Sequence, residues 1–315
     1  MSEKVYDTLV VGGGPAGYTA ALYATRAGLD TLLLEKLSAG GQMTETAQID
    51  NYPGFAEGVD GFSLGDAMKR GAERFGARTV QTEVLSMDLR AVPKRITTDT
   101  GELLAHTVIL AMGAAHRHLG VEREQELVGK GVGYCAACDG MFYRGKTVAV
   151  VGGGNSAVAD ALLLSRICKK VYLIHRRAQL RATRVYHDAL MKAENVTFLW
   201  DSRVVGLLSE KKGAAAPFEA LCGVTVEHVR SMERSELVVD GLFISVGRAP
   251  ASSMVADQLT LDESGYIVAD ESTETNLPGV FVAGDVRTKA VRQIVTATAD
   301  GAVAAHAAEE YLARS

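Results

Sequence analysis

The stretch VYDTLVVGGGPAGYTAALYATRAG, residues 5–28, decides the fold. Its first residues, Val5–Val11, have the pattern of a buried strand, and three glycines follow at once. We predict a small-residue helix over Ala16–Ala27 and a second strand over Thr31–Leu34 that ends at Glu35. A strand, a glycine-rich turn, a helix and a strand closing on an acid are typical of a dinucleotide-binding βαβ unit.

The same layout returns 140 residues later. The sequence predicts a strand over Thr147–Val151, a helix over Ser156–Cys168 and a strand over Val171–Ile174 that ends at His175. The acid that closes the first unit and the histidine that closes the second each lie 23 residues after the first glycine of their turn. The chain therefore contains a duplicated module rather than two chance clusters of glycine.

The remaining apolar segments suggest how the two modules are joined. Thr107–Ala114 and Gly241–Arg248 each contain a buried-strand pattern that closes on glycine, and we place the domain crossings after them. Near the end, Val280–Asp285 predicts a strand closing on Gly-Asp, and a helix is expected over Gln293–Ala313. We predict an α/β protein with two Rossmann-like, three-layer ββα nucleotide-binding domains, the second inserted into the first. The expected limits are residues 1–116 and 247–315 for the first domain and residues 117–246 for the second.

Composition narrows the class of protein. The chain has 315 residues, of which 47% are hydrophobic, so it can bury two cores, and its formal net charge is −5, which argues against binding to nucleic acid. The start is charged and leads directly into a strand, and no apolar run reaches the roughly 18–20 residues that a membrane span needs. These features predict a soluble cytoplasmic protein that does not enter a membrane.

The first glycine turn predicts an FAD site. Glycines let the backbone approach a pyrophosphate, the helix start offers N–H groups, and Glu35 can accept the ribose hydroxyls. Asp285, after a glycine at a strand end, suits a ribityl chain, and the helix start that follows suits the flavin N1–C2=O edge. An ordinary turn with a helix cap is the alternative for Gly284 and Asp285. The residues assigned on this basis are Gly12, Gly14, Pro15, Ala16, Gly17, Glu35, Gly284 and Asp285.

The second turn predicts an NADPH site. His175 stands where the first module has its acid, and three arginines follow it. Guanidinium groups grip a 2′-phosphate, whereas a carboxylate favours a free 2′-hydroxyl. A solvated basic face is the alternative explanation. The assigned residues are Gly152, Gly154, Asn155, Ser156, Ala157, His175, Arg176, Arg177 and Arg181.

A dithiol motif, Cys135-Ala136-Ala137-Cys138-Asp139, precedes the second turn. A reducing cytosol disfavours structural disulfides, so a close cysteine pair there is catalytic or binds metal. Zinc would need two further ligands, but Cys168 and Cys222 stand alone, and we expect both to be buried packing residues. We predict no metal site and a redox-active pair that passes electrons to another disulfide. An inert pair of buried thiols is the alternative, and Asp139 argues against it as a neighbouring proton carrier.

Taken together, these motifs resemble the low-molecular-weight, bacterial-type thioredoxin reductases over essentially the whole chain. The segments that carry the resemblance are Gly12–Gly17, Gly40–Met43, Asn51–Gly54, Cys135–Gly140, Gly152–Ala157, His175–Arg181, Pro278–Val286 and Arg292–Gln293. Two positions depart from the usual pattern: Ala137 replaces a threonine, and Pro250-Ala251-Ser252 replaces Pro-Asn-Thr.

The resemblance implies further properties. It implies a homodimer with an FAD domain and an NADPH domain, thioredoxin as the protein substrate, and a large rotation between the domains. It implies that Cys138 faces the flavin, Cys135 attacks thioredoxin and Asp139 is the acid/base. It also adds Gly41, Gln42, Asn51, Arg292 and Gln293 to the FAD site.

Three other functions remain open from sequence. The flavoprotein of a peroxide-reducing system would need an additional N-terminal thioredoxin-like region, and this sequence begins at the first strand. Relatives that use ferredoxin or oxygen would lack the basic grip that begins at His175. A nucleotide-binding redox sensor, or a metal-bound regulator with little turnover, belongs to a different class.

Overall fold

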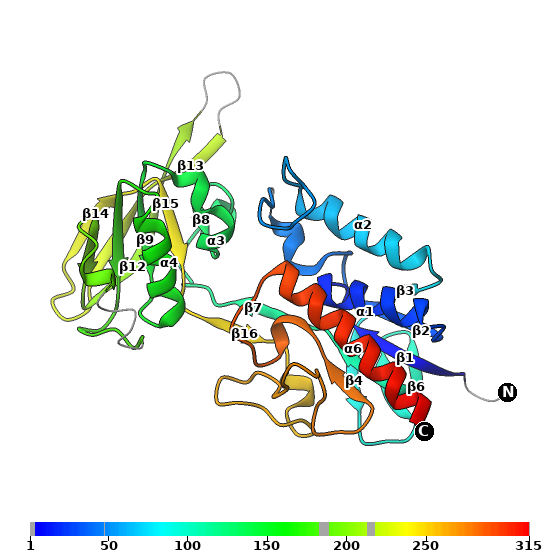
Figure 1. Ribbon diagram of the computed structural model, residues 1–315. Coiled ribbons are helices and arrows are strands. Elements are labelled where there is room, and N and C mark those ends of the chain that lie inside the picture. Colours follow the sequence, from blue (N-terminus) through cyan, green and yellow to red (C-terminus); the bar gives the residue numbers. More distant parts are fainter. Residues whose placement is uncertain (1–3, 47, 183–188, 213–217, 315) are drawn as a thin grey trace. The chain divides into compact units, whose positions relative to one another are not determined.

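The structure is a computed structural model that describes residues 4–46, 48–182, 189–212 and 218–314. The chain divides into two compact units, with Met1–Ala115 and Ala249–Ser315 in unit 1 and His116–Arg248 in unit 2. Unit 2 is therefore inserted into unit 1, as the colour sequence of Figure 1 shows. The expected limits, after residues 116 and 246, differ from these by one and two residues.

Unit 1 begins with the predicted βαβ module. Its elements, including the two strands at the chain crossings, are β1 (Val5–Val11), α1 (Pro15–Arg26), β2 (Thr31–Glu35), η1 (Gly41–Glu45), α2 (Gly61–Glu73), β3 (Arg78–Gln81), β4 (Val84–Asp88), β5 (Lys94–Thr98), β6 (Gly101–Leu110), β7 (Ala114–His116), β16 (Arg248–Pro250), η4 (Ser253–Val255), β17 (Val280–Val282), η5 (Gly284–Val286) and α6 (Ile294–Arg314), where η marks a 3₁₀ helix.

The sheet of unit 1 is built around β6. Strands β3, β2, β1 and β6 lie side by side and parallel, and β17 pairs in parallel with the second half of β6. The first half of β6 pairs instead with β5, which pairs with β4, and both pairings are antiparallel. One long strand therefore belongs both to a parallel sheet and to an antiparallel meander.

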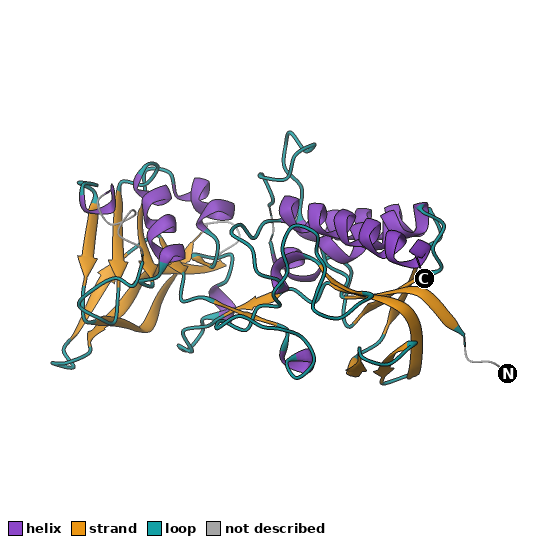
Figure 2. Ribbon diagram, turned by 60° about the horizontal axis from the view of Figure 1, so that its bottom comes forward, coloured by secondary structure: helices purple, strands orange, loops and turns teal. Residues whose placement is uncertain are grey.

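Side chains alternate along β1 and fill two cores. Val10 packs with the alanines of α1 and α6, while Leu9 and Val11 pack on the opposite face with Met87, Ile96 and residues from 255–286. Helices cover one face of the sheet and the meander covers the other, which is the predicted three-layer arrangement (Figure 2).

Unit 2 repeats this plan. Its elements are η2 (Gln125–Leu127), β8 (Val132–Gly133), α3 (Ala136–Asp139), η3 (Gly140–Tyr143), β9 (Thr147–Val151), α4 (Asn155–Ser165), β10 (Lys170–Ile174), β11 (Val196–Leu199), β12 (Ser202–Lys212), β13 (Phe218–His228), β14 (Arg234–Val238) and β15 (Gly241–Ile244).

The parallel sheet of unit 2 has the order β11-β10-β9-β15-β8, and β12, β13 and β14 form an antiparallel sheet. Val148 and Val150 pack toward α4, while Ala149 and Val151 pack toward β12 and β13. The duplication predicted from sequence is thus confirmed as two three-layer α/β units.

Three expectations about elements need correction. The strands expected to close on Gly113 and Gly247 end earlier, at Leu110 and Ile244, because the chain leaves each sheet before it reaches the crossing. Helix α4 ends at Ser165, so Cys168 lies beyond it, buried, with its thiol donating to the carbonyl of Tyr143. Cys222, on β13 of the antiparallel sheet, is only half-buried.

The two chain crossings run side by side. β7 and β16 pair in a two-stranded sheet of their own. The flanking residues continue this ribbon, because Ala251 donates to the carbonyl of Gly113 and Arg117 donates to the carbonyl of Gly247. Among the helices of the described residues, none is both long enough and apolar enough to cross a bilayer.

Helix α6 packs along α1 through small residues, and Gly301 lies against Ala16 and Ala20 of α1. A Cβ on Gly301 would overlap the carbonyl oxygen of Ala16. We expect Gly301→Ala to lower the free energy of unfolding by about 1–3 kcal/mol through overpacking, measured as a lower thermal midpoint. Gly71 on α2 is the matched control, because a Cβ there meets no atom within 4 Å and the helix gains about 0.5–1 kcal/mol from alanine. Equal shifts for the two variants would contradict a close α1–α6 contact.

Candidate functional site

The first glycine turn lies between β1 and α1. Helix α1 starts at Pro15 after Gly14, with no side-chain cap and no acid in its first turn. Gly12 has φ +107°, and a Cβ there would overlap the carbonyl oxygen of Ala111. A Cβ on Gly14 would meet nothing within 4 Å, so the turn presents open space in front of the helix start. This arrangement is a cradle for a phosphate group.

Glu35 closes this cradle from the end of β2. Its Oε2 accepts from the backbone N–H of Gly13 at 2.5 Å, and its Oε1 accepts from Leu37 at 3.1 Å. Both oxygens are thereby aimed by backbone groups, and lone pairs remain for a ribose. The predicted contact between the strand-end acid and the glycine turn is present.

The other residues assigned to FAD come from segments of unit 1 that are far apart in the sequence. The α-carbon of Gly14 lies 3.3 Å from the position of a Cβ on Gly41, and the Gln42 amide donates to the carbonyl of Ala114 at 2.6 Å. The Asn51 amide donates to the Gln293 amide oxygen at 3.0 Å, although the two residues are 242 positions apart.

The segment after β17 also packs against the first glycine turn, at the start of α1. Gly284 has φ +79°, and a Cβ there would lie 3.0 Å from the Cβ of Ala16 at the start of α1. Arg292 donates to the carbonyl of Asp285 at 3.4 Å, and its guanidinium lies 3.9 Å from the centre of the Tyr266 ring. The turn at Gly284–Asp285, called the tail turn below, and the first glycine turn are therefore neighbours.

The second glycine turn has the same geometry in unit 2. Helix α4 starts at Asn155 after Gly154, again with no side-chain cap and no acid in its first turn. Ala157, in the place of the third glycine, is fully buried. The ring of His175 lies against Gly153, as Glu35 lies against Gly13.

His175 and the arginines surround this turn. The Nε2 atom of His175 is buried and has no hydrogen-bond partner among the residues that the structure describes. Burial lowers the pKa of His175, and the charges of Arg181, Arg177 and Arg176 lower it further. The backbone of Arg181 donates to the carbonyl of Gly153 at 2.7 Å, and the three arginine side chains are exposed. Unit 2 thus presents one buried imidazole and three exposed guanidinium groups at a helix start.

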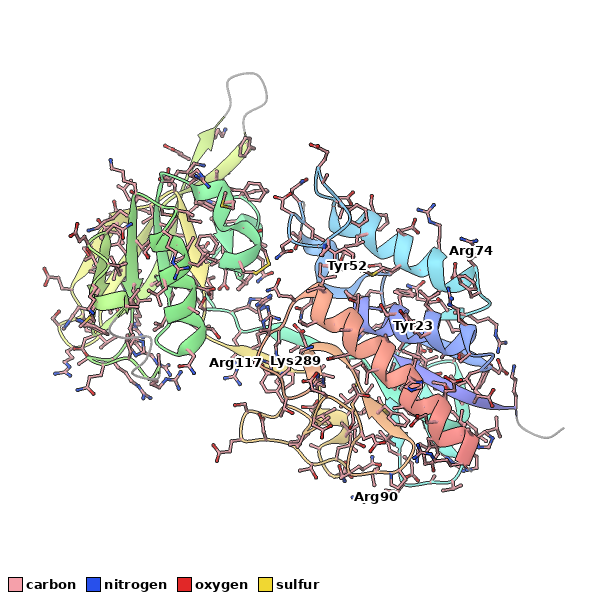
Figure 3. All side chains as sticks on the ribbon, in the orientation of Figure 1. Tyr23, Tyr52, Arg74, Arg90, Arg117 and Lys289 are labelled. Atoms are coloured by element: carbon pink, nitrogen blue, oxygen red, sulfur yellow. A yellow bond between two sulfur atoms is a disulfide. The ribbon has the colours of Figure 1, made fainter. Side chains whose placement is uncertain are left out.

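The dithiol is a disulfide in this structure. Cys135, the N-cap of the short helix α3, is joined to Cys138 within that helix, with their α-carbons 5.2 Å apart (yellow bond in Figure 3). The sulfur of Cys135 accepts from the backbone N–H of Cys138 at 3.2 Å. Both cysteines are half-buried, so the bond is neither sealed in a core nor fully exposed.

Asp139 ends α3 in a partly enclosed position. Burial raises the pKa of Asp139 from its ordinary value of 3.8 to about 6. Its neighbour Tyr143 has a pKa raised to about 12, first by burial and then by the charge of Asp139. A carboxyl group with a pKa of about 6, on the residue that follows Cys138 in the chain, is suited to proton transfer. In the described part of the chain, no three His, Cys, Asp or Glu side chains gather as metal ligands would.

Sequence reasoning missed two supporting groups. Asp300 on α6 is buried between Arg287 and Lys289, and the available signal was an acid on the apolar face of an alanine-rich helix. The turn after β11 was also missed. There Ser202 donates to the carbonyl of His175 at 3.0 Å, and Trp200 lies edge-on to the His175 ring with centroids 6.5 Å apart.

The site residues fit two nucleotides and a redox disulfide. The first turn offers open space, free helix-start donors and an aimed acid, which suit FAD; the second offers an orphaned imidazole nitrogen and arginines, which suit a pyridine nucleotide. This combination defines a class, the disulfide oxidoreductases that use nucleotide cofactors.

Comparison with known proteins agrees. The family model described as pyridine nucleotide-disulphide oxidoreductase matches residues 6–301. The chain is 43% identical over 312 residues to the thioredoxin reductase of Listeria innocua, covering 98% of this chain and 95% of that protein. It is 41% identical over 310 residues to that of Treponema pallidum, covering 98% of each. A crystal structure of thioredoxin reductase from Streptococcus pyogenes has a TM-score of 0.90 at 39% identity, covering 100% of both chains.

This chain belongs to the low-molecular-weight thioredoxin reductases of the pyridine nucleotide-disulphide oxidoreductase family. Membership implies that it binds FAD and a pyridine nucleotide.

The raised pKa of Asp139 has a consequence for stability. The folded protein holds this proton up to about pH 6, whereas the unfolded chain releases it near pH 4. Wild-type stability therefore falls as pH rises through that window. We expect Asp139→Asn to be more stable than wild type above pH 6, on the order of 2 kcal/mol, and to lose the gain near pH 4. Denaturant unfolding at pH 4 and pH 7.5 measures this.

The same Asp139→Asn variant loses a proton carrier, so we expect its turnover with thioredoxin to fall by about 10²-fold or more. Asp257→Asn is the control, since Asp257 is exposed. A variant that is no more stable at pH 7.5 than at pH 4, relative to wild type, would rule out a raised Asp139 pKa.

Proposed function

We propose that this protein carries two electrons from NADPH, by way of FAD, to the Cys135–Cys138 disulfide and from there to the disulfide of thioredoxin. The observation that carries the proposal is the half-buried disulfide on the unit that holds the second glycine turn, where Asp139, the residue after Cys138, has a raised pKa. When bound, FAD supplies two-electron exchange between the nicotinamide and sulfur.

The two units divide the cofactors between them in this proposal. Unit 1 holds FAD through the Gly12–Gly17 turn, Glu35, and the residues that converge on them from 41–51 and 284–293. Unit 2 holds NADPH through the Gly152–Ala157 turn and the basic residues after β10. We assign the arginines to the 2′-phosphate of NADPH, because a guanidinium group forms paired, charge-assisted hydrogen bonds with a phosphate.

Reduction of the disulfide takes two electrons and two protons and leaves thiols at Cys135 and Cys138. Only a thiolate attacks the next disulfide, so one sulfur must lose its proton. Asp139 gives a proton to the newly formed thiolate and later takes it back, because a pKa of about 6 makes both directions accessible near neutral pH.

The transfer to thioredoxin is two exchanges. The Cys135 thiolate attacks one sulfur of the thioredoxin disulfide, which breaks that bond, forms a mixed disulfide and expels the other thioredoxin sulfur as a thiolate that takes up a proton. The Cys138 thiol then releases its proton, and its thiolate attacks the Cys135 sulfur, restores the Cys135–Cys138 bond and releases the second thioredoxin thiolate, which takes up a proton. We assign the attacking role to Cys135 and the flavin-facing role to Cys138 from the family resemblance.

The disulfide must meet flavin at one step and thioredoxin at another. We propose that the β7–β16 ribbon is the hinge for this change, because both crossings between the units run through it. We also propose that the protein works as a homodimer. Support for this comes from large apolar side chains exposed on unit 1, where Tyr23 is 50% and Phe62 63% exposed.

Cys138→Ser separates the two halves of the reaction. We expect NADPH to reduce the flavin of this variant, seen as bleaching of the yellow colour, while thioredoxin reduction is abolished because no disulfide can form. Cys222→Ser is the matched control, since Cys222 is a free, half-buried thiol, and it should keep full activity. Retained turnover with thioredoxin in Cys138→Ser would refute the assigned role of the pair.

Removal of two of the arginine side chains after β10 tests whether the protein prefers NADPH to NADH. The double variant Arg176→Ala, Arg177→Ala should bind NADPH about 10- to 100-fold more weakly and leave NADH almost unchanged, since charge-assisted bonds to the 2′-phosphate are lost. Arg166→Ala, an exposed arginine at the end of α4, is the control. Equal losses for NADPH and NADH would remove the 2′-phosphate argument.

Flavin bleaching by NADPH and turnover with thioredoxin, measured on the wild-type protein, distinguish the alternatives. A wild-type protein bleached by NADPH but inactive with thioredoxin would be a related flavin oxidoreductase with another acceptor. A colourless protein without flavin would be a nucleotide-binding regulator.

A further inference from the structure

A buried ionic cluster lies behind the turn at Gly284–Val286 in unit 1. The Asp300 carboxylate on α6 accepts four hydrogen bonds: from the Gly284 N–H at 2.9 Å, Arg287 Nε at 2.9 Å, Arg287 Nη2 at 2.7 Å and Lys289 Nζ at 2.7 Å. The side chains of Asp300, Arg287 and Lys289 are 7%, 2% and 5% exposed. Burial by itself would raise the pKa of Asp300, but the two cations hold it below its ordinary value, so the carboxylate stays charged.

The turn is also held from its other side. Arg292 donates to the carbonyl of Asp285 at 3.4 Å and to that of Arg287 at 3.2 Å, and its guanidinium packs on Tyr266. The turn's first N–H is thus fixed by Asp300, and two of its following carbonyls are fixed by Arg292. Backbone held at both ends is pre-organised to present its groups to a ligand.

The next residue of α6 touches the other nucleotide-facing segment. Gly301 lies so close to the carbonyl of Ala16 that a Cβ would overlap it, and a Cβ on Gly284 would lie 3.0 Å from the Cβ of Ala16. Two consecutive residues of α6, Asp300 and Gly301, therefore contact the tail turn and the start of α1, respectively. These are the two segments that the proposed function assigns to FAD.

We propose that Asp300 is a positioning residue for FAD, which fixes the Gly284–Asp285 turn against the first glycine turn before the cofactor binds. Stability alone is a weak reason to keep these charges, because apolar residues of similar volume often replace a buried ion cluster without loss. The Gly284 N–H contact gives the carboxylate a role that an apolar residue cannot take over. The inference rests on the proposed function, since it takes unit 1 as the FAD site.

Release of FAD from the full-length holoenzyme tests the inference. We expect Asp300→Asn to lower FAD affinity by about 10-fold and Asp300→Leu by about 100-fold, because the first loses charge and the second also loses the acceptor for Gly284. The readouts are recovery of FAD fluorescence on dilution and the visible circular dichroism of the bound flavin, which should change shape. Glu310→Gln, on the exposed face of α6, should leave both unchanged.

A second variant separates positioning from folding. The triple variant Arg287→Met, Lys289→Met, Asp300→Leu removes all three charges together and leaves no buried ion uncompensated. We expect it to unfold at a temperature near that of wild type and still to bind FAD weakly, because Gly284 has lost its anchor. Wild-type affinity and an unchanged flavin spectrum in this variant would overturn the proposal, since charge compensation would then be the whole role of Asp300.

The wild-type protein offers a check that needs no substitution. We expect the backbone amides of Gly284, Arg287 and Thr288 to exchange with deuterium slowly in the FAD-free full-length chain, because each already donates a hydrogen bond within unit 1. Fast exchange that becomes slow only after FAD is added would overturn pre-organisation by Asp300. A wild-type chain that binds no FAD at all would instead refute the proposed function, so the two failures are distinguishable.

Discussion

The parallel pairing of β6 with both β1 and β17 is the constraint on which unit 1 depends. The two registers place Val11, Leu110 and Val282 in one row across the sheet, and Ala283 continues the ladder by donating to the carbonyl of Leu110 at 2.9 Å. Parallel strands that end in the same row release their chains at one edge of the sheet. The first glycine turn and the Gly284 turn therefore emerge side by side, although 133 residues of another unit separate the two crossings in sequence.

The two units use one plan with different residues at the decisive position. In each, the side chain at the end of the second strand lies against the middle glycine of the turn. Glu35 brings acceptors that backbone N–H groups aim, whereas His175 brings a buried imidazole with exposed arginines beside it. Acceptors suit hydroxyl groups and guanidinium donors suit phosphate, so the two turns share one geometry and differ in local charge.

Two aspartates show how surroundings decide the use of one functional group. Asp139 is half-buried, and desolvation raises its pKa to about 6. Asp300 is buried, but Arg287 and Lys289 face it and hold its pKa down. The first can exchange protons near neutral pH, while the second stays ionised and can hold backbone. Desolvation acts on both carboxyl groups, and the presence of cations decides the outcome.

The sequence by itself determined the two βαβ modules, their order and the chemistry available at each turn. Periodicity, glycine spacing and the identity of the strand-end residue are local, so β1, β9 and the paired cysteines could be predicted within a residue or two. Tertiary structure alone decided where β6 ends, that Asn51 meets Gln293, and that Asp300 lies between two cations. These contacts join segments far apart in the chain, and no local pattern encodes them, because they arise only when sheet register and helix packing bring those segments together.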